Sequence, residues 1–385
     1  MNDFERQFEE VRDLLRFNDY GLVIKRIIDF TLDTQKTEFY KKTNTLLDWL
    51  DANPQQEHIN QKLTESLDGL YACLSAIPLS DKKNILQAID VKKAYSPAAF
   101  ALGPVNLELN EGDILGLVGE NGNGKTTLLR LLCGELFSTS GTVKYNFRYN
   151  DLYDLRTKLV YIPQRTETWR GSMYENLVFT ASCYGYTPEE NYLVVELIIA
   201  RLGLRKFRKH SWKSLSSGYK MRFELARMLL RKPKVLLIDE PLANLDILAQ
   251  QTVLEDFRAI AKSPFRPIGI ILSSQQLYEV EKTSDQVIFL KHGQQKNLHD
   301  TTGITDAPQE KQLVIEFESP LTQSQLNDAL HELGLVSLQF NGGTYIATFS
   351  SSVAVNSFLQ LVISKNIPLA YFRNISNSTR RFFVS

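Results

Sequence analysis

The sequence has no apolar run approaching the ~20 residues that a membrane-spanning helix requires, so we expect no segment to cross a membrane. It also has no net charge, because 44 basic residues balance 44 acidic ones. This balance gives no overall preference for nucleic acid or for an anionic membrane surface, although a local basic patch stays possible. The first six residues are charged and contain no apolar signal core, which favours the cytoplasm over secretion.

Cysteine is scarce: the chain has three, Cys73, Cys133 and Cys183. They are odd in number, far apart and without the spacing of metal ligands, which argues against a disulfide framework and against a zinc site. Each cysteine is flanked by apolar residues. We therefore expect buried free thiols in a reducing compartment.

Two regions of different periodicity make up the first 300 of the 385 residues. In residues 1–84, apolar residues recur at spacings of three and four, which predicts a small helical bundle. Its apolar stripes are interpreted as core, with a docking surface as the alternative. In residues 85–300, helical patterns alternate with short apolar runs at 114–118, 159–162, 235–238 and 268–272. This alternation predicts an α/β domain with a buried, mostly parallel sheet.

The spacing of apolar residues changes again after a polar linker that ends near residue 309. Residues 310–385 contain a strand pattern, a helix at 321–333, two strands around Gly342-Gly343, a helix at 353–364 and a last strand at 369–372. The order βαββαβ predicts a ferredoxin-like α+β domain.

The most informative segment is residues 119–127, which fit GxxxxGK followed by threonine, between a predicted strand and a helical pattern. Glycines allow successive N–H groups to face a phosphate, and the helix N-terminus adds partial positive charge. Lys125 would reach the β- and γ-phosphates, and the Thr126 hydroxyl would bind Mg²⁺. The alternative is a glycine-rich turn that only resembles the motif. The predicted nucleotide-binding residues of this loop are Gly119, Asn121, Gly122, Gly124, Lys125, Thr126 and Thr127.

Two carboxylates end a later apolar run, residues 235–238, at Asp239 and Glu240. The carboxyl ends of parallel strands converge on the ligand crevice, so these side chains are predicted to meet the nucleotide. Asp239 would hold Mg²⁺, and Glu240 would orient and deprotonate the attacking water. Helix capping or simple solvation of the acidic pair is the alternative.

Further motifs stand in a fixed order around this pair. Gln164 follows Tyr161-Ile162-Pro163, residues 215–222 read LSSGYKMR, and Asn244-Leu245-Asp246 comes after the acidic pair. In this order the motifs resemble the ATP-binding cassette (ABC) ATPase family over about residues 87 to 297, and residues 138–141 resemble the family's turn after the first helix. The resemblance implies a P-loop NTPase core with a helical subdomain at about residues 165–230.

The resemblance also implies roles for single residues, because in this family two cassettes close head to tail with ATP between them. Ser216 and Gly218 would contact the γ-phosphate held by the partner, while Ser216 is also suited to a helix N-cap. Gln164 would sense Mg²⁺ and relay site occupancy to the helical subdomain, and Asp246 would couple the two halves. Tyr95 lies where the family stacks an aromatic ring on adenine, with ordinary packing as the alternative.

The chain departs from the family pattern at three positions. Ser217 replaces the first glycine of the usual Leu-Ser-Gly-Gly-Gln signature, and Tyr219 replaces its glutamine. Gln275 stands where the family places a switch histidine that contacts the γ-phosphate, and glutamine cannot carry positive charge. Loss of such a partner commonly lowers a rate by about 10²–10³. We predict intact ATP binding with slow or partner-dependent hydrolysis.

These motifs predict an ATP-binding and ATP-hydrolysing subunit of an ABC transporter, peripheral on the cytoplasmic face of the membrane. It would need separate integral membrane permease subunits and a second ABC ATPase subunit, in a homodimer or a heterodimer. The 310–385 domain, with Ile375-Ser376-Asn377-Ser378 near its end, weakly resembles the tail of exporter ATP-binding subunits whose permeases are separate chains. The N-terminal bundle lies outside the common cassette and is predicted to regulate or to dock.

Two other functions stay open. A soluble ABC ATPase acting on ribosomes or DNA is disfavoured by the neutral charge, the single cassette and the lack of a basic linker or a coiled-coil insertion. A binding-only regulatory cassette is favoured by Gln275 and disfavoured by Glu240.

Overall fold

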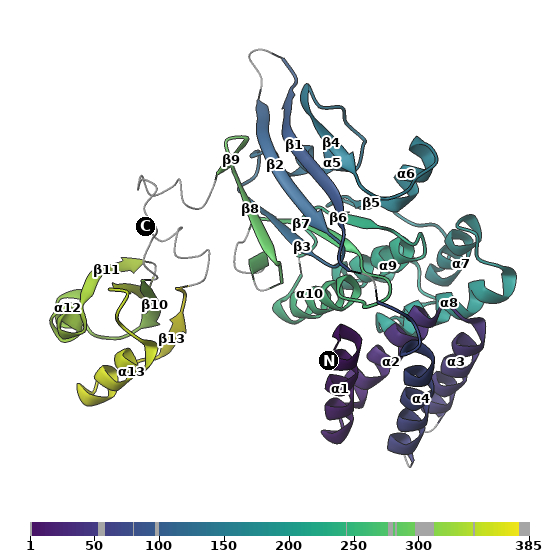
Figure 1. Ribbon diagram of the computed structural model, residues 1–385, viewed down its shortest axis with the longest axis horizontal. Coiled ribbons are helices and arrows are strands. Elements are labelled where there is room, and N and C mark those ends of the chain that lie inside the picture. Colours follow the sequence, from purple (N-terminus) through teal and green to yellow (C-terminus); the bar gives the residue numbers. More distant parts are fainter. Residues whose placement is uncertain are drawn as a thin grey trace. The chain divides into compact units, whose positions relative to one another are not determined.

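The structure is a computed structural model that describes residues 2–52, 58–79, 81–96, 100–243, 245–275, 280–281, 283–296, 312–341 and 343–376. The chain divides into two compact units, one of residues 1–275 and 283–295 and the other of residues 276–282 and 296–385 (Figure 1). The boundaries predicted at residues 84 and 300 stay predictions. Within the described residues, no helix combines the length and the apolar character that crossing a membrane demands.

Four helices open the first unit. Asn2 and Glu5 form a reciprocal capping box at the first helix, and the Asp19 side chain accepts a hydrogen bond at the start of the second. The apolar faces of α1, α2 and α4 merge into one core, against which Phe265 of the following domain also packs, as expected for apolar stripes that form core. The helices are α1 (Asp3–Arg16), α2 (Tyr20–Thr34), α3 (Thr37–Ala52) and α4 (Ile59–Leu74).

A six-stranded sheet forms the centre of the α/β domain, in the order β5-β6-β7-β3-β8-β9. The neighbours from β5 to β8 are parallel, which confirms the predicted parallel sheet. The strands β3, β7 and β6 are parallel neighbours. The segments that follow β3 and β6 therefore emerge close together, at the carboxyl ends of the strands. The strands are β3 (Ile114–Val118), β5 (Leu159–Ile162), β6 (Val235–Ile238), β7 (Gly269–Ser274), β8 (Gln286–Lys291) and β9 (Gln294–Lys296).

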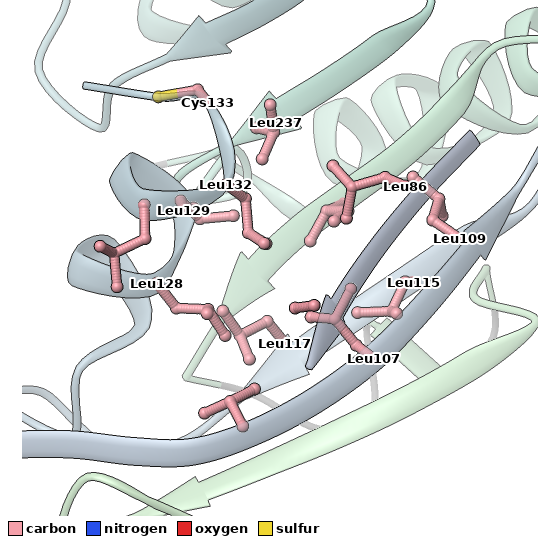
Figure 2. Packing of buried hydrophobic residues seen from close by; sticks show 14 of the residues in the cluster. Leu86, Leu107, Leu109, Leu115, Leu117, Leu128, Leu129, Leu132, Cys133 and Leu237 are labelled. Atoms are coloured by element: carbon pink, nitrogen blue, oxygen red, sulfur yellow. The ribbon is translucent and has the colours of Figure 1, made fainter. Parts of the chain in front are cut away.

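A second, antiparallel sheet of order β2-β1-β4 was not distinguished by the apolar pattern. Its strands are β1 (Asn84–Ala94), β2 (Ala101–Asn110) and β4 (Ser140–Tyr145), and helix α5 (Lys125–Leu132) follows β3. Figure 2 shows Leu128, Leu129 and Leu132 of α5 among side chains from both sheets, including Leu107 and Leu117. This shared core fixes the N-terminal end of α5 relative to the sheet edge.

The other helices of the first unit are α6 (Leu152–Lys158), α7 (Met173–Cys183), α8 (Pro188–Arg201), α9 (Ser217–Leu229) and α10 (Ile247–Ala261), with short 3-10 turns at Arg205–Phe207 and Trp212–Ser214. Helices α7, α8 and α9 fall within the residues predicted as a helical subdomain. Helices α2 and α3 of the bundle pack against α8 (Figure 1).

The second unit contains a four-stranded antiparallel sheet of order β11-β12-β10-β13, with the connections β10, α12, β11, β12, α13, β13. This is the βαββαβ order of a ferredoxin-like domain, as predicted. The last strand begins two residues later than predicted, and the linker at 300–309, Gly342 and Asn377-Ser378 lie outside the described residues. The elements are β10 (Leu313–Glu318), α12 (Gln323–Leu330), a 3-10 turn (His331–Leu333), β11 (Leu335–Asn341), β12 (Thr344–Phe349), α13 (Val355–Ser364) and β13 (Tyr371–Asn374).

The cysteines are free thiols, but they are not all buried. Cys133 is buried, and burial raises the pKa of its thiol to about 11. Cys73 is partly exposed and Cys183 is exposed, so the expected burial is wrong for these two. In α7 the buried residues are Met173, Leu177 and Ala181, and the helical period turns position 183 to the outer face.

Candidate functional site

The loop at residues 119–127 requires glycine at two positions where the backbone is tightly surrounded. A Cβ added to Gly119 would lie 2.4 Å from the carbonyl oxygen of Leu290. Gly124 has a φ of +96°, and a Cβ there would lie 2.8 Å from Leu102 Cδ1. Both positions exclude larger residues, so the loop can hold its curved backbone only with this glycine pattern.

Lys125 starts α5 and places its ammonium group inside the loop. Its Nζ donates a hydrogen bond of 2.6 Å to the carbonyl oxygen of Gly119 and lies 3.0 Å from Oε1 of Glu240. The side chains of Lys125 and Glu240 are 5% and 10% exposed. Their contact is an ion pair without an aligned hydrogen bond, since Oε1 of Glu240 has no hydrogen-bond partner among the described residues.

Asp239 is buried at the end of β6 and receives three hydroxyl hydrogen bonds. Thr126 Oγ1 donates to its Oδ2 at 2.6 Å, Ser273 Oγ donates to its Oδ1 at 2.6 Å, and the Tyr161 hydroxyl donates to Oδ2 at 3.3 Å. Burial, followed by the negative charge of Asp239, raises the pKa of Tyr161 well above its usual range. Tyr161 therefore stays a neutral donor, and Asp239 is held in one orientation beside Thr126.

Glu240 sits in the left-handed region of the backbone map, with a φ of 50°. A residue other than glycine adopts this conformation at a cost of roughly 1–3 kcal/mol, which is characteristic of functional sites. The Glu240 N–H donates a hydrogen bond of 2.9 Å to Ser273 Oγ, the same hydroxyl that binds Asp239. Ser273 thus positions both acidic residues.

Sequence reasoning missed Ser273 and several other residues of the site. The available signal was a hydroxyl in the apolar strand β7, which the sheet order places between β3 and β6. Asn123 was also missed. Its Oδ1 accepts a 2.8 Å hydrogen bond from the His292 N–H, which links the loop at residues 119–127 to the turn after β8. Phe100 and Glu120 line the pocket without having been predicted.

A pocket of about 180 Å³ brings most of the predicted residues together. It lies along the loop at residues 119–127 and reaches Gln164 and Glu240. The lining residues that the sequence predicted are Asn121, Gly122, Gly124, Lys125, Thr126, Thr127, Gln164 and Glu240.

Three predicted residues gather away from this pocket, at the N-terminal ends of α9 and α10. Ser216 takes the N-cap position of α9, although in the described part of the chain its side chain makes no capping hydrogen bond. A Cβ on Gly218 would lie 3.5 Å from Ala249 Cβ, which places the start of α9 beside the start of α10. Asp246 caps α10, its side chain accepting from the Ala249 N–H at 2.9 Å.

Two further predicted residues lie in exposed positions. Tyr95 is 58% exposed, and the Lys93 ammonium lies 5.4 Å from the centre of its ring. Gln275 is exposed directly after β7. As far as the described residues go, neither side chain lines the 180 Å³ pocket.

The residues around the loop fit a magnesium-bound nucleoside triphosphate. The donors at one end, the Thr126 hydroxyl and the Asp239 carboxylate, are the hard oxygen ligands that Mg²⁺ prefers. Lys125 supplies a buried cation beside them, and the N-terminus of α5 opens onto the same loop. Every one of these groups is suited to phosphate or to its metal ion.

The comparisons with known proteins agree with this arrangement. Residues 102–243 match the sequence model of a family described as ABC transporter. The lactococcin transport/processing ATP-binding protein LcnC-like of Lactococcus lactis is 31% identical over 218 residues, which cover 54% of this chain and 29% of that protein. The methionine import ATP-binding protein MetN 2 of Listeria monocytogenes is 29% identical over 274 residues, covering 69% of this chain and 79% of the relative.

A solved structure is similar as well. It is cbiO1 from Clostridium perfringens, part of the ABC transporter complex cbiONQ, with a TM-score of 0.51 and 25% sequence identity. The match covers 56% of this chain and 87% of that chain. By contrast, this chain spans less than a third of the lactococcin relative, 29% of its length.

Proposed function

We propose that this chain, which contains an ATP-binding domain of the ABC transporter family, binds and hydrolyses ATP to power separate permease subunits in a membrane. The observation that carries the proposal is the arrangement at the edge of the parallel sheet. Lys125 and Thr126 of the loop meet Glu240 and Asp239, which directly follow β6, at 3.0 Å and 2.6 Å respectively.

Each residue of the pocket has a role in this proposal. Thr126 and Asp239 would hold Mg²⁺, and the bound ion would neutralise charge on the phosphate oxygens. Lys125 exchanges its pairing with Glu240 for a phosphate, and its removal from Oε1 leaves that oxygen able to accept a proton from water. Gln164 lines the same pocket, where it would sense Mg²⁺.

A second cassette completes the site in the proposed assembly, as a homodimer or a heterodimer. Ser216, Gly218 and Asp246 gather outside the pocket of their own chain, as expected of residues that serve the site of a partner. The residues that follow Asp246 support an interface here: Ile247 and Leu248 are apolar side chains that are 72% and 75% exposed. In this proposal the protein lies at the cytoplasmic face of the membrane through its permease partners.

The proposal is tested with the purified full chain. Titration with ATP and Mg²⁺ should show binding, and release of phosphate should be well below the ~10 s⁻¹ typical of enzymes until permease subunits are added. Purification from detergent-solubilised membranes should retain a hydrophobic permease and a second cassette. Retention of ribosomes or nucleic acid in place of a permease would favour the soluble ABC function instead.

A binding-only regulatory cassette is the second candidate, and Gln275 is the observation that favours it. The side chain is exposed at the end of β7 and cannot supply the positive charge of a histidine. This candidate predicts ATP binding with no phosphate release above background, with or without permease subunits. A rate that falls on Glu240→Gln substitution would exclude it.

A further inference from the structure

A second and larger pocket, of about 380 Å³, lies within the first unit between the helical bundle and the α/β domain. Its walls come from α2 and the first part of α3, from α8, and from the ends of α9 and α10 with the segments that follow them. The volume falls in the range of about 300–1,000 Å³ that is usual for small-molecule sites. None of the residues assigned to ATP lines this pocket in the described part of the chain.

Arg266 lines this pocket and is held so that its two terminal nitrogens stay free. Its Nε donates to Oδ1 of Asp33 at 2.9 Å, and its backbone N–H donates to Ser263 Oγ at 3.0 Å. Ser263 Oγ donates to the same Oδ1 at 2.8 Å, which fixes the carboxylate that holds the guanidinium. The Arg266 side chain is 40% exposed, and among the described residues its Nη1 and Nη2 have no hydrogen-bond partner. A guanidinium fixed in this way presents paired N–H groups that match the two oxygens of a carboxylate.

Two tyrosine hydroxyls in the same wall are also unused. Tyr40 of α3 is 7% exposed, and Tyr186, in the segment before α8, is half-buried. Within the part of the chain that the structure describes, neither hydroxyl makes a hydrogen bond, and neither oxygen is completely buried. Burial raises the pKa of both phenols, and the nearby positive charge of Arg266 opposes this shift only in part. Both hydroxyls therefore stay protonated at neutral pH and can donate to a ligand.

The charges that line the pocket sum to +1, because four cations stand against three carboxylates. The carboxylates are already engaged: Oδ1 of Asp29 accepts from Arg201 at 2.7 Å, and Oδ1 of Asp33 accepts from Arg266. The Oδ2 atoms of both aspartates are buried, so a ligand cannot reach them. Glu190 belongs to the capping box of α8. The cations are Arg201, Lys232, Lys234 and Arg266, and the carboxylates are Asp29, Asp33 and Glu190.

Two lysines after α9 add positive charge that a ligand can reach. Lys232 is exposed and makes no ion pair with any described residue; its Nζ lies 4.1 Å from the centre of the Tyr186 ring. The Lys234 side chain is 46% exposed, with its Nζ 3.6 Å from Oε1 of Glu111. Together with Arg266, these residues offer a ligand cations and N–H donors, which favours an anion.

The remaining wall suits an apolar or aromatic body, because Leu32, Ile198 and Phe265 contribute apolar surface. A site of this kind, mostly apolar with a few placed polar groups, is typical of small organic ligands. The net charge of the lining matches a single negative charge better than the two charges of a phosphate monoester. These features together favour a carboxylate.

We propose that this pocket binds a small organic monoanion, a carboxylate on an apolar or aromatic body, whose oxygens accept hydrogen bonds from Arg266 and from the hydroxyls of Tyr40 and Tyr186. The site is independent of the ATP site, so it stands or falls separately from the proposed ATPase function. Because Tyr40 belongs to the bundle and Arg266 to the α/β domain, the ligand is held between the two.

The experiment uses the full chain and indole-3-propionate, a carboxylate on an aromatic body, as the probe. Calorimetric titration should show saturable binding, and millimolar probe should raise the Tm by about 1–3 °C. Tryptamine, which carries an ammonium group in place of the carboxylate, should give no shift. Absence of binding by indole-3-propionate, or equal binding of tryptamine, overturns the proposal.

Removal of one hydroxyl locates the site. Tyr186→Phe deletes a donor that has no partner in the described part of the protein, so indole-3-propionate should bind at least about tenfold more weakly while the Tm and the ATP affinity are retained. Tyr192→Phe, at a 57% exposed tyrosine of α8 outside the pocket, is the matched control and should bind as the wild type does. Equal weakening by both substitutions, or by neither, contradicts the assignment.

Arg266→Lys tests the guanidinium. Lysine keeps a positive charge beside Asp33 but loses the paired N–H groups, so the probe should again bind at least about tenfold more weakly. The control is Arg6→Lys, at a side chain of α1 that is 59% exposed, which should leave the affinity unchanged. An Arg266→Lys protein with the affinity of the wild type would show that the guanidinium does not hold the carboxylate, and would reject the proposed site.

Hydrogen exchange on the wild-type protein decides the matter even where Arg266→Lys does not fold. Indole-3-propionate should slow amide exchange in the segments around residues 32–40 and 263–268, which contain Tyr40 and Arg266. Saturable binding that leaves exchange in both segments unchanged places the probe elsewhere and rejects this site.

Discussion

Two clusters of buried charge in the first unit differ in where their members come from. In the proposed ATP site, the 180 Å³ pocket along residues 119–127 that we call the ATP pocket, Lys125 and Glu240 follow the parallel strands β3 and β6, and their ion pair lines the pocket. In the other cluster, Arg201 of α8 pairs at 2.7 Å with both Asp29 of α2 and Asp256 of α10. The first cluster has charge available for a ligand, whereas the second joins three helices.

The pKa of Arg201 shows how strongly its charge is held in this cluster. Burial alone lowers the pKa of the guanidinium, but Asp29 and Asp256 outweigh it and the net shift is upward. Arg201 is therefore a cation held by its two carboxylates, and removing it leaves Asp29 without a cation and Asp256 with only the more distant Lys25, at 3.5 Å. The comparison predicts that substitutions in the Arg201 cluster act on stability, and those in the ATP pocket on ligand binding and rate.

The largest effect is expected for Arg201→Met. It leaves Asp29 without a cation and Asp256 with Lys25 alone, at 3.5 Å, which should lower the free energy of unfolding by about 3–5 kcal/mol. Denaturant titration followed by circular dichroism measures the change. The control is Arg205→Met, whose partners Asp48 and Asp51 are 73% and 67% exposed, so the loss should be at most about 1 kcal/mol. Equal losses would show that the Arg201 cluster has no special structural role.

Glu240→Gln tests the other side of the comparison. The amide cannot accept a proton from water, so phosphate release should fall by about 10²–10³ while ATP still binds. The rate is measured by phosphate release in the presence of permease subunits, and affinity by calorimetry. Replacement of an exposed acid, as in Glu108→Gln, is the control. A Glu240→Gln protein that keeps its rate would show that another residue activates the water.

Lys125→Met should weaken ATP by about 100-fold, because a charged hydrogen-bond donor to phosphate contributes roughly 1.5–3 kcal/mol. Calorimetric titration with ATP and Mg²⁺ measures the loss. Lys144→Met, at an exposed position of β4, should leave affinity unchanged. If Lys125→Met lowers the Tm by many degrees but barely changes the affinity for ATP, Lys125 has a structural role like that of Arg201. The proposed difference between the two clusters is then wrong.

The smallest effect concerns the pH dependence of stability through Asp33. Its pKa is raised above the ordinary value of 3.8, first by burial and against the opposing charge of Arg266. The folded protein thus holds this proton more tightly than the unfolded chain, so the stabilisation from protonated Asp33 is present below about pH 4 and is lost as the pH rises through the folded pKa. Asp33→Asn lacks this titration.

The measurement is the difference in Tm between wild type and Asp33→Asn at several pH values from 4 to 8. The difference, wild type minus variant, should fall as the pH rises. Other carboxylates are common to both proteins and cancel. A difference that rises with pH would mean that Arg266 outweighs burial at this site.

The sequence was sufficient for the parts of the site that lie close together in the chain. The loop at residues 119–127 and the pair Asp239-Glu240 were predicted because each directly follows a short apolar run. The run marks the strand, and the motif after it marks where the strand ends. The βαββαβ order of the second unit was predicted for the same reason. The last strand, with Tyr371 as its first residue, was displaced by two because short apolar runs do not mark their own ends.

Residues that act through a neighbouring strand were beyond the sequence pattern. Ser273 reads as an ordinary hydroxyl in β7, and only the strand order places it within 2.6 Å of Asp239 and 2.9 Å of the Glu240 N–H. Cys183 was expected to be buried from its apolar neighbours, but the helix phase set by the core turns it outward.

The sequence by itself determined the type of each unit and that the loop at residues 119–127 and the acidic pair each follow a strand, since these depend on local backbone conformation and on periodic apolar burial. Only the tertiary structure decided which distant groups meet: Ser273 with the acidic pair, and Arg201 with Asp29 and Asp256 across three helices. The physical reason is that hydrogen bonds and ion pairs act over about 3 Å, so they are specified by packing rather than by spacing along the chain.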